Sequence, residues 1–182
     1  LGSILQGHPD AVKVPGVDAS TGSLGQGLSI ANGMALAGKL DRKDYTVYTI
    51  IGDGETEEGQ IWEAAMTAAH YQLGNLIAFL DYNHLQIDGR IEDVMGNGNF
   101  TNRFKAFGWH VIDIDGHDLQ AIDEAVKAAK QEKDAPTMII AHTVKGKGVK
   151  FMEHVADWHG KAPSYEQALE AIQLLGGTWE GK

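Results

Sequence analysis

The sequence predicts an α/β protein in which helices cover both faces of a doubly wound parallel sheet. Short runs rich in β-branched and aromatic residues alternate along the chain with longer segments whose apolar residues recur at helical spacing. Strands and helices in this alternation form right-handed βαβ units around a parallel sheet. Polar, glycine-containing segments follow three of the predicted strands, and ligands of such sheets bind beyond the carboxyl ends of the strands.

The first half of the sequence alternates helix, strand, helix and strand. Apolar residues recur at helical spacing in "LGQGLSIANGMALAGKL", which predicts a helix over 24–40, and its small residues favour close packing on another helix. The run "YTVYTII" is rich in β-branched and aromatic residues and predicts a strand over 45–51. A helix over 57–73 and a buried strand over 75–81, "NLIAFLD", complete this half.

The second half repeats the alternation. Its predicted elements are a short helix over 100–108, a strand over 109–115, a helix over 119–131, a strand over 135–143 and a final helix over 164–175. Asp118 and Ser164 stand at the starts of two of these helices, where such side chains cap free backbone N–H groups. Internal repeats and low-complexity linkers are absent, so residues 1–182 are expected to form a single domain.

The charge balance argues against a nucleic-acid or anionic-membrane surface. The 182 residues include 15 Lys and Arg against 25 Asp and Glu, a net charge of −10. There is no Cys, which excludes a disulfide framework and a thiolate zinc site. The apolar runs are too short to span a bilayer, and no signal peptide is recognisable.

Side chains suited to a metal and a phosphate follow two of the strands. Asp53, in "GDGE", and Asn83, in "DYNHLQIDG", are separated by one helix and one strand, so they should meet at neighbouring strand ends. Carboxylate and amide oxygens suit Mg²⁺, which often shares its ligand shell with phosphates. Gly54 leaves its backbone N–H open to a phosphate at the positive end of a helix.

Two other interpretations compete for these motifs. A GDG triplet by itself is more often a simple turn with an exposed aspartate, but Asn83 at the next strand end and the nearby Leu85 carbonyl reverse that preference. A dinucleotide site lacks its fingerprint, because Ile30 and Phe151 stand where GxGxxG requires its third glycine.

The spacing of GDG and Asn83, with 28 residues between them, resembles the signature of thiamine-diphosphate enzymes. The surrounding sequence resembles the N-terminal, diphosphate-binding half of transketolase. Matching segments run through almost the whole chain in the order of that family: "GHPD", "TGSLGQGLSIANGMA", "GDGETEEGQIWEAA", "DYNHLQIDG", "GWHVIDIDGHD", "KGKGVKFME" and "WHGKAP".

The resemblance implies a thiamine diphosphate site with a divalent metal, Mg²⁺ or in its place Ca²⁺ or Mn²⁺. Asp53, Asn83 and the Leu85 carbonyl would hold the metal. The residues that would contact the cofactor are Gly22, Ser23, Leu24, Gly52, Gly54, Asn83, Lys145 and His159. Ser23 replaces the proline that the family has in its Gly-Pro-Leu segment.

Three residues correspond to positions with catalytic or coupling roles in the family. His159 would act in the substrate channel, and His8 matches a channel histidine that meets the sugar. Glu58 matches an acid near the dimer interface that couples the two active sites. Glu55 and Glu57 are expected to be solvated first-turn acids, favoured there by the helix dipole.

The resemblance implies transfer of a two-carbon ketol unit from a ketose or ketose phosphate to an aldose. A complete enzyme also needs a pyrimidine-binding half, and the C-terminal segment resembles the split transketolases, in which the halves are separate subunits. The alternatives are a deoxyxylulose-phosphate synthase, a 2-oxo acid dehydrogenase α subunit or a non-catalytic truncated partner. "WHGKAP" and "GHPD" favour transketolase.

The expected assembly is a heterotetramer, a dimer of pairs made with the pyrimidine-binding partner. The helices over 24–40 and 57–73 would form the contact between diphosphate-binding halves, with Glu58 facing its symmetry mate. We expect this domain, lacking an upstream segment, to act in the cytoplasm, in the pentose phosphate pathway of carbohydrate metabolism.

Other conspicuous residues receive structural roles. We expect apolar faces of the core to include Trp62, Trp109, Phe79 and Met66, and we expect a surface position for His154 and a helix-start turn for His117.

Overall fold

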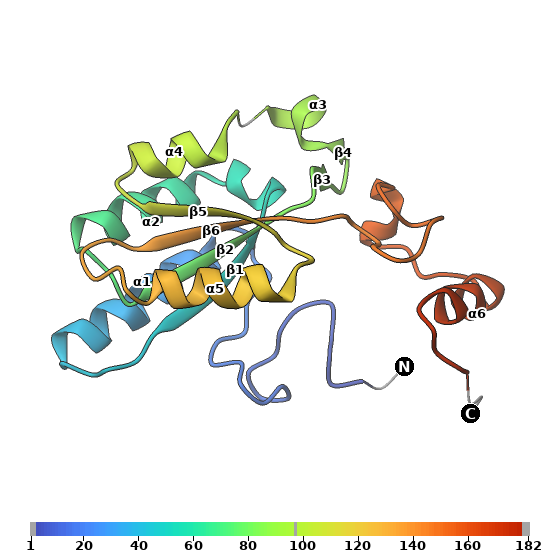
Figure 1. Cartoon of the computed structure of the whole chain (residues 1–182), viewed down its shortest axis with the longest axis horizontal. Coiled ribbons are helices and arrows are strands. Elements are labelled where there is room, and N and C mark those ends of the chain that lie inside the picture. The colour runs from blue at the N-terminus through green and yellow to red at the C-terminus, as the bar shows by residue number, and fades with distance from the viewer. Residues whose placement is uncertain (1–2, 97, 180–182) are drawn as a thin grey trace.

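The computed structural model describes residues 3–96 and 98–179. Its centre is a sheet of four strands, β1 (Val47–Gly52), β2 (Leu76–Tyr82), β5 (His110–Asp115) and β6 (Thr137–His142). They lie in the order β1-β2-β6-β5, and each neighbouring pair is parallel (Figure 1). The predicted parallel sheet is confirmed.

Helices cover both faces of this sheet, as predicted. Figure 1 shows α2 (Gly59–His70) and α4 (Phe100–Ala106) on one face and α5 (Leu119–Ala129) on the other. Helix α1 (Gln26–Leu40) packs against α2 and against the edge strand β1. Within the described ranges, no helix combines the length and apolar character that a membrane span requires.

The core consists of two clusters because alternate residues of each strand face opposite sides of the sheet. Leu76 and Leu80 of β2 belong to the larger cluster, together with Phe104 of α4. Ile77, between them, belongs to the smaller cluster, which includes Ala125 of α5. This double burial explains why β2 reads in the sequence as a nearly continuous apolar run.

Shorter elements surround the carboxyl ends of the strands. They are η1 (Gly54–Glu57), a hairpin of β3 (Leu85–Gln86) and β4 (Gly89–Arg90), α3 (Ile91–Met95) and η2 (Ala156–His159). After β6 the chain leaves the sheet and ends in α6 (Tyr165–Leu174), which lies away from the sheet (Figure 1). The sequence did not predict the hairpin or α3, because two-residue strands carry no periodic pattern.

The predicted elements differ from the observed ones mainly at their ends. The helix over 24–40 begins at Gln26, because Gly25 adopts the left-handed conformation with φ 84°. Two predicted caps are present: Asp118 accepts hydrogen bonds from two amides of α5, and Ser164 forms a capping box with Gln167. Met66 is 55% exposed, so its prediction as a core residue was wrong.

Candidate functional site

Asp53 lies where β1 ends and η1 begins. Its Oδ1 accepts a hydrogen bond from the Gly54 amide at 2.8 Å, and its Oδ2 accepts one from the His84 amide at 2.6 Å. The residue is buried, with 2% of its surface exposed. The structure therefore joins the end of β1 to the loop after β2, as the parallel register of Gly52 with Asp81 requires.

The environment of Asp53 disfavours its charged form. Burial raises the pKa of the Asp53 carboxyl above its ordinary 3.8, and the nearby Asp81 charge adds to the rise. The amides of Gly54 and His84 oppose this shift by donating hydrogen bonds to the carboxylate. A divalent cation beside this carboxylate would compensate the cost of burying its charge.

Asn83 is the second buried polar residue at this edge, 8% exposed. Its Oδ1 accepts a hydrogen bond from the Leu85 amide at 3.0 Å, and its Nδ2 donates one to Asp81 Oδ2 at 3.2 Å. The other Asp81 oxygen accepts from the Thr143 hydroxyl, which follows β6. These bonds fix the orientation of the Asn83 amide, whose oxygen keeps a second lone pair for another partner.

The oxygen atoms near Asp53 have the chemistry that a small divalent cation needs. Among the described residues, no three or more His, Cys, Asp or Glu side chains gather into a metal-binding cluster. The predicted ligand set has a different composition: one carboxylate, one amide oxygen and one backbone carbonyl, from Asp53, Asn83 and Leu85. Mg²⁺ binds few protein oxygens and completes its shell with water and phosphate, so the residues present fit this ion.

The prediction that the Gly54 amide is open to a phosphate was wrong for this structure, because the amide donates to Asp53 Oδ1. Gly54 needs to be glycine for a different reason. A Cβ at this position would lie 2.5 Å from Gln86 Oε1 and 2.8 Å from Gln86 Cβ. The first strand of the hairpin therefore packs directly on the GDG backbone. Gln86 is thus part of this site, although no sequence pattern assigned it a role.

The predicted cofactor loop of Gly22, Ser23 and Leu24 precedes α1. Gly22 has φ 136°, and a Cβ there would lie 2.5 Å from His8 Nδ1, so the imidazole rests on the glycine. Ser23 and Leu24 are exposed. His8 is also exposed and lines an open hollow of about 500 Å³ with Gln6, Gly7, Pro9, Asp10, Ser20 and Thr21. The structure thus brings His8 and this loop together.

Lys145 and His159 belong to the segment that follows β6. Lys145 is half-buried, and its loop is tied to the sheet because the Val144 amide donates to His117 Nε2 at 2.8 Å. His117 lies in the predicted helix-start turn, and this contact gives it a structural role. His159 is exposed at the end of η2, which packs beside β3. His154 is exposed, as predicted.

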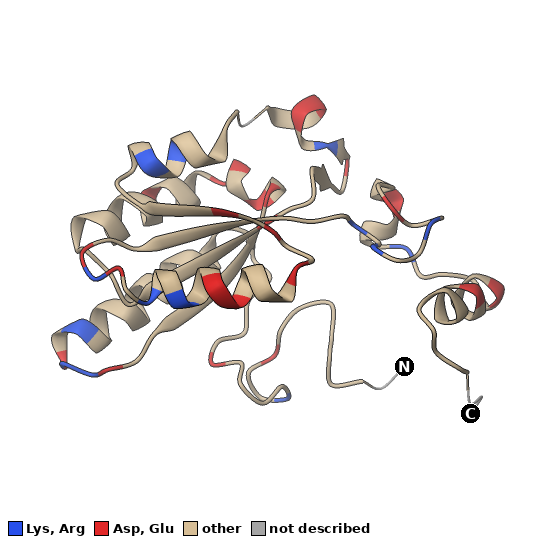
Figure 2. Ribbon diagram, in the orientation of Figure 1, with Lys and Arg blue, Asp and Glu red and all other residues tan. Residues whose placement is uncertain are grey.

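The acids after GDG do not all behave as predicted (Figure 2 shows them as red segments near the end of β1). Glu58 is exposed and lies beside Gly25. Glu55 is not a solvated acid: it is half-buried, and both of its carboxylate oxygens accept backbone hydrogen bonds. Glu57 is half-buried too, and its Oε1 is buried without a hydrogen-bond partner among the described residues.

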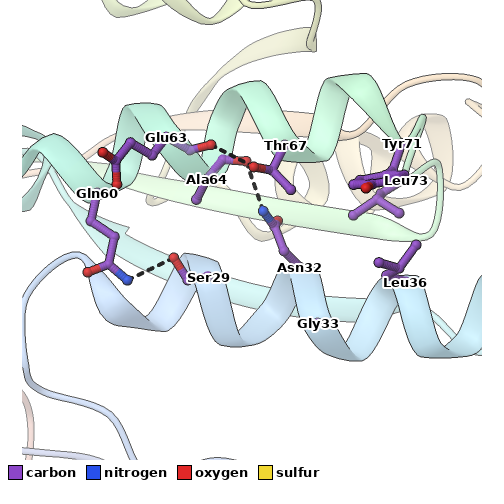
Figure 3. Close-up of a pocket in the computed structure, with 10 residues that line it drawn as sticks. All are labelled: Ser29, Asn32, Gly33, Leu36, Gln60, Glu63, Ala64, Thr67, Tyr71 and Leu73. Atoms are coloured by element: carbon purple, nitrogen blue, oxygen red, sulfur yellow. Dashed lines mark hydrogen bonds between the residues drawn. The ribbon is translucent and has the colours of Figure 1, made fainter.

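A groove of about 380 Å³ lies between α1 and α2 (Figure 3). Asn32 lines it and is 5% exposed; its Nδ2 donates to the Ala64 carbonyl at 2.8 Å. The Asn32 Oδ1 is buried and has no partner within the described part of the chain. Gln60 Nε2 donates to Ser29 Oγ at 2.9 Å and links the two helices at one end of the groove.

A parallel α/β sheet with buried polar groups and glycine turns at its carboxyl edge defines a cofactor-binding α/β domain. The family model described as "Transketolase, thiamine diphosphate binding domain" matches residues 1–179, so the chain belongs to this family. The family assignment and the fold inferred from the sequence motifs are both confirmed.

Curated relatives include subunits of transketolases. The chain is 45% identical over 173 residues to an apulose-4-phosphate transketolase subunit of Phocaeicola vulgatus, covering 95% of this chain and 61% of that protein. It is 48% identical over 168 residues to a 6-deoxy-6-sulfo-D-fructose transketolase subunit of Clostridium sp. (strain MSTE9), covering 92% and 59%. The chain therefore spans less than two thirds of the length of either relative.

Solved transketolases share the fold. The transketolase of Campylobacter jejuni superimposes with a TM-score of 0.88 at 34% sequence identity, over 98% of this chain and 29% of that chain. The similarity therefore extends through nearly all of the present chain and concerns a minor part of the larger enzyme.

Proposed function

We propose that this chain is the diphosphate-binding subunit of a split, thiamine-diphosphate-dependent transketolase. It would transfer a two-carbon ketol unit from a ketose phosphate to an aldose, in the cytoplasm, in the pentose phosphate pathway. The observation that carries this proposal is the buried Asp53 carboxylate, held by amides from two strand ends within a member of the transketolase family. The names of the two relatives, each a transketolase subunit, support the split form.

The cofactor site would form around the GDG turn. Asp53, Asn83 and the Leu85 carbonyl would hold Mg²⁺, and the Gly52, Gly54 and Asn83 region would meet the diphosphate. Thiamine diphosphate supplies the nucleophilic carbon and the electron sink for ketol transfer when bound. The chain itself contributes charge compensation at the metal. The Gly54 amide, which donates to Asp53 Oδ1, would exchange that partner for a phosphate oxygen when the cofactor binds.

Residues around this turn would orient the substrate and move protons. Gly22, Ser23 and Leu24 would lie along the cofactor, and Lys145 would offer its cation to the diphosphate. His159, exposed at the end of η2 beside the hairpin that carries Leu85, would donate a proton to a substrate oxygen or accept one from it. His8, packed on Gly22, would contact the sugar at the channel entrance.

The proposed enzyme is a heterotetramer built from two such subunits and two pyrimidine-binding partners. The contact between the two copies would lie at the groove between α1 and α2, whose lining includes the exposed Gly33 and the half-buried Leu36. Glu58, exposed just before α2, would meet its symmetry mate.

The sugar named for one relative is a phosphate and that for the other a sulfonate, which supports an anionic sugar substrate.

The test is titration calorimetry of thiamine diphosphate and Mg²⁺ into the assembled enzyme, comparing the wild type with Asp53→Ala. We expect the wild type to bind and the variant to lose Mg²⁺-dependent binding. Asp44→Ala is a matched control, because Asp44 is exposed and precedes the opposite end of β1. Equal affinity of Asp53→Ala and wild type would overturn the assignment of the metal site.

A further inference from the structure

We propose that Glu55 is a positioning residue. It holds the Gly22–Leu24 loop at a fixed position relative to the GDG turn (Gly52–Gly54) and thereby sets the affinity for the cofactor. Glu55 Oε1 accepts a hydrogen bond from the Gly25 amide at 2.9 Å, and Oε2 accepts one from the Gly52 amide at 3.0 Å. One carboxylate thus connects the start of α1 to the end of β1. The inference rests on the proposed function, because it assumes that both segments meet thiamine diphosphate.

The Gly25 amide depends on this carboxylate. Gly25 is buried and is the N-cap of α1, a position whose amide lies before the first helical hydrogen bonds. Because glycine has no side chain, Gly25 itself provides no side-chain cap for α1. A carboxylate here also lies at the positive end of the helix dipole, which strengthens the bond.

The backbone on the loop side adopts conformations that ordinary residues rarely adopt. Gly22 and Gly25 have φ of 136° and 84°, so this loop has two left-handed glycines within four positions. Ser23 and Leu24, between them, are exposed. A loop of this kind has many alternative conformations, and a fixed carboxylate at its end selects one of them.

The geometry requires two acceptor oxygens on one rigid group. A glutamine at position 55 has one oxygen and one NH₂ group, so one of the two glycine amides would face a donor. An aspartate keeps the charge but is one methylene shorter and cannot reach both amides. Glu55→Gln and Glu55→Asp therefore test the proposal in two independent ways, and either variant decides it if the other does not fold.

The matched control is Glu132→Gln. Glu132 also accepts a backbone hydrogen bond, from the Asp134 amide at 2.8 Å, but it lies in the turn between α5 and β6, at the opposite end of the sheet. The control therefore removes the same negative charge from an acceptor of a backbone amide, away from the predicted cofactor site, and leaves one oxygen for the single amide bound there.

The experiment combines two measurements. Hydrogen exchange of the Gly25 and Gly52 amides is followed by NMR in the chain without cofactor. The dissociation constant of thiamine diphosphate with Mg²⁺ is measured by calorimetry in the assembled enzyme. Hydrogen bonds to a charged group contribute enough that losing one predicts about 10- to 100-fold faster exchange and about 10- to 100-fold weaker cofactor binding in both variants.

Activity at saturating cofactor separates positioning from chemistry. We expect the turnover number of the Glu55 variants to stay within about twofold of the wild type once the site is filled, with Glu132→Gln unchanged in every measurement. Wild-type cofactor affinity in Glu55→Gln or Glu55→Asp would overturn the proposal, even if the variants melt at a lower temperature. A wild type that binds no thiamine diphosphate would instead overturn the proposed function and the affinity claim, and the exchange data would still show whether Glu55 holds the loop.

Discussion

Asp53 places a carboxylate inside the protein with backbone amides as its direct hydrogen-bond partners. The absence of a Cβ at Gly54 lets Gln86 pack on the turn from β1 into η1. The sequence predicted the convergence of Asp53 with the 83–85 loop, because parallel strands end at the same edge. It could not predict the roles of Glu55 and Gln86, whose partners are set by the folded loops and not by any spacing.

The raised pKa of Asp53 predicts a pH-dependent stability in the absence of metal. The folded state holds this proton more tightly than the unfolded state, so the free energy of unfolding decreases as pH rises from about 3.8 through the raised pKa. Asp53→Asn removes this titration. The stability of the wild type relative to Asp53→Asn should therefore fall as pH rises, as measured by denaturant unfolding at several pH values without Mg²⁺. A difference in unfolding free energy between wild type and Asp53→Asn that does not change with pH would contradict the claim that burial raises the pKa of Asp53.

At the scale of elements, the sequence predicted every strand of the sheet and the helices that cover it. Burial on both faces made β2 recognisable, and the side chains of Asp118 and Ser164 marked two helix starts. The hairpin of β3 and β4 was not predicted, since its shape depends on packing against η1 and η2. The close packing of Gly74, in the turn between α2 and β2, was not predicted either, because Gly74 lies against Lys133, nearly 60 residues away in the sequence.

A substitution at Gly74 tests how closely the α2–β2 turn packs against the backbone at Lys133. A Cβ at Gly74 would lie 2.2 Å from the Lys133 carbonyl oxygen, a backbone atom that cannot rotate away. Gly74→Ala should therefore lower the free energy of unfolding by about 1–3 kcal/mol. Gly33→Ala is the control, since nothing lies within 4 Å of a Cβ in this helical position, and it should stabilise the chain by about 0.5–1 kcal/mol. Equal stabilities for the two variants in urea unfolding would contradict the packing.

At the scale of the whole molecule, the α1–α2 groove is the surface that we propose for self-association. Gly33 is exposed and lines this groove, so a large charged side chain there should block a second copy without disturbing the fold. We expect Gly33→Arg to halve the mass of the assembly in light scattering with partner, cofactor and Mg²⁺, and Gly33→Ala to keep it. An unchanged mass for Gly33→Arg would place the contact elsewhere.

The most direct test of the account is ketol transfer by the reconstituted enzyme. The chain is mixed with its candidate pyrimidine-binding subunit, thiamine diphosphate and Mg²⁺, and transfer from a ketose phosphate to an aldose is followed; a parallel sample uses a form as long as the curated relatives. We predict transfer that requires both subunits, the cofactor and the metal, and that Asp53→Ala abolishes. Assembly of both subunits with bound cofactor and no ketol transfer in either sample would contradict the account.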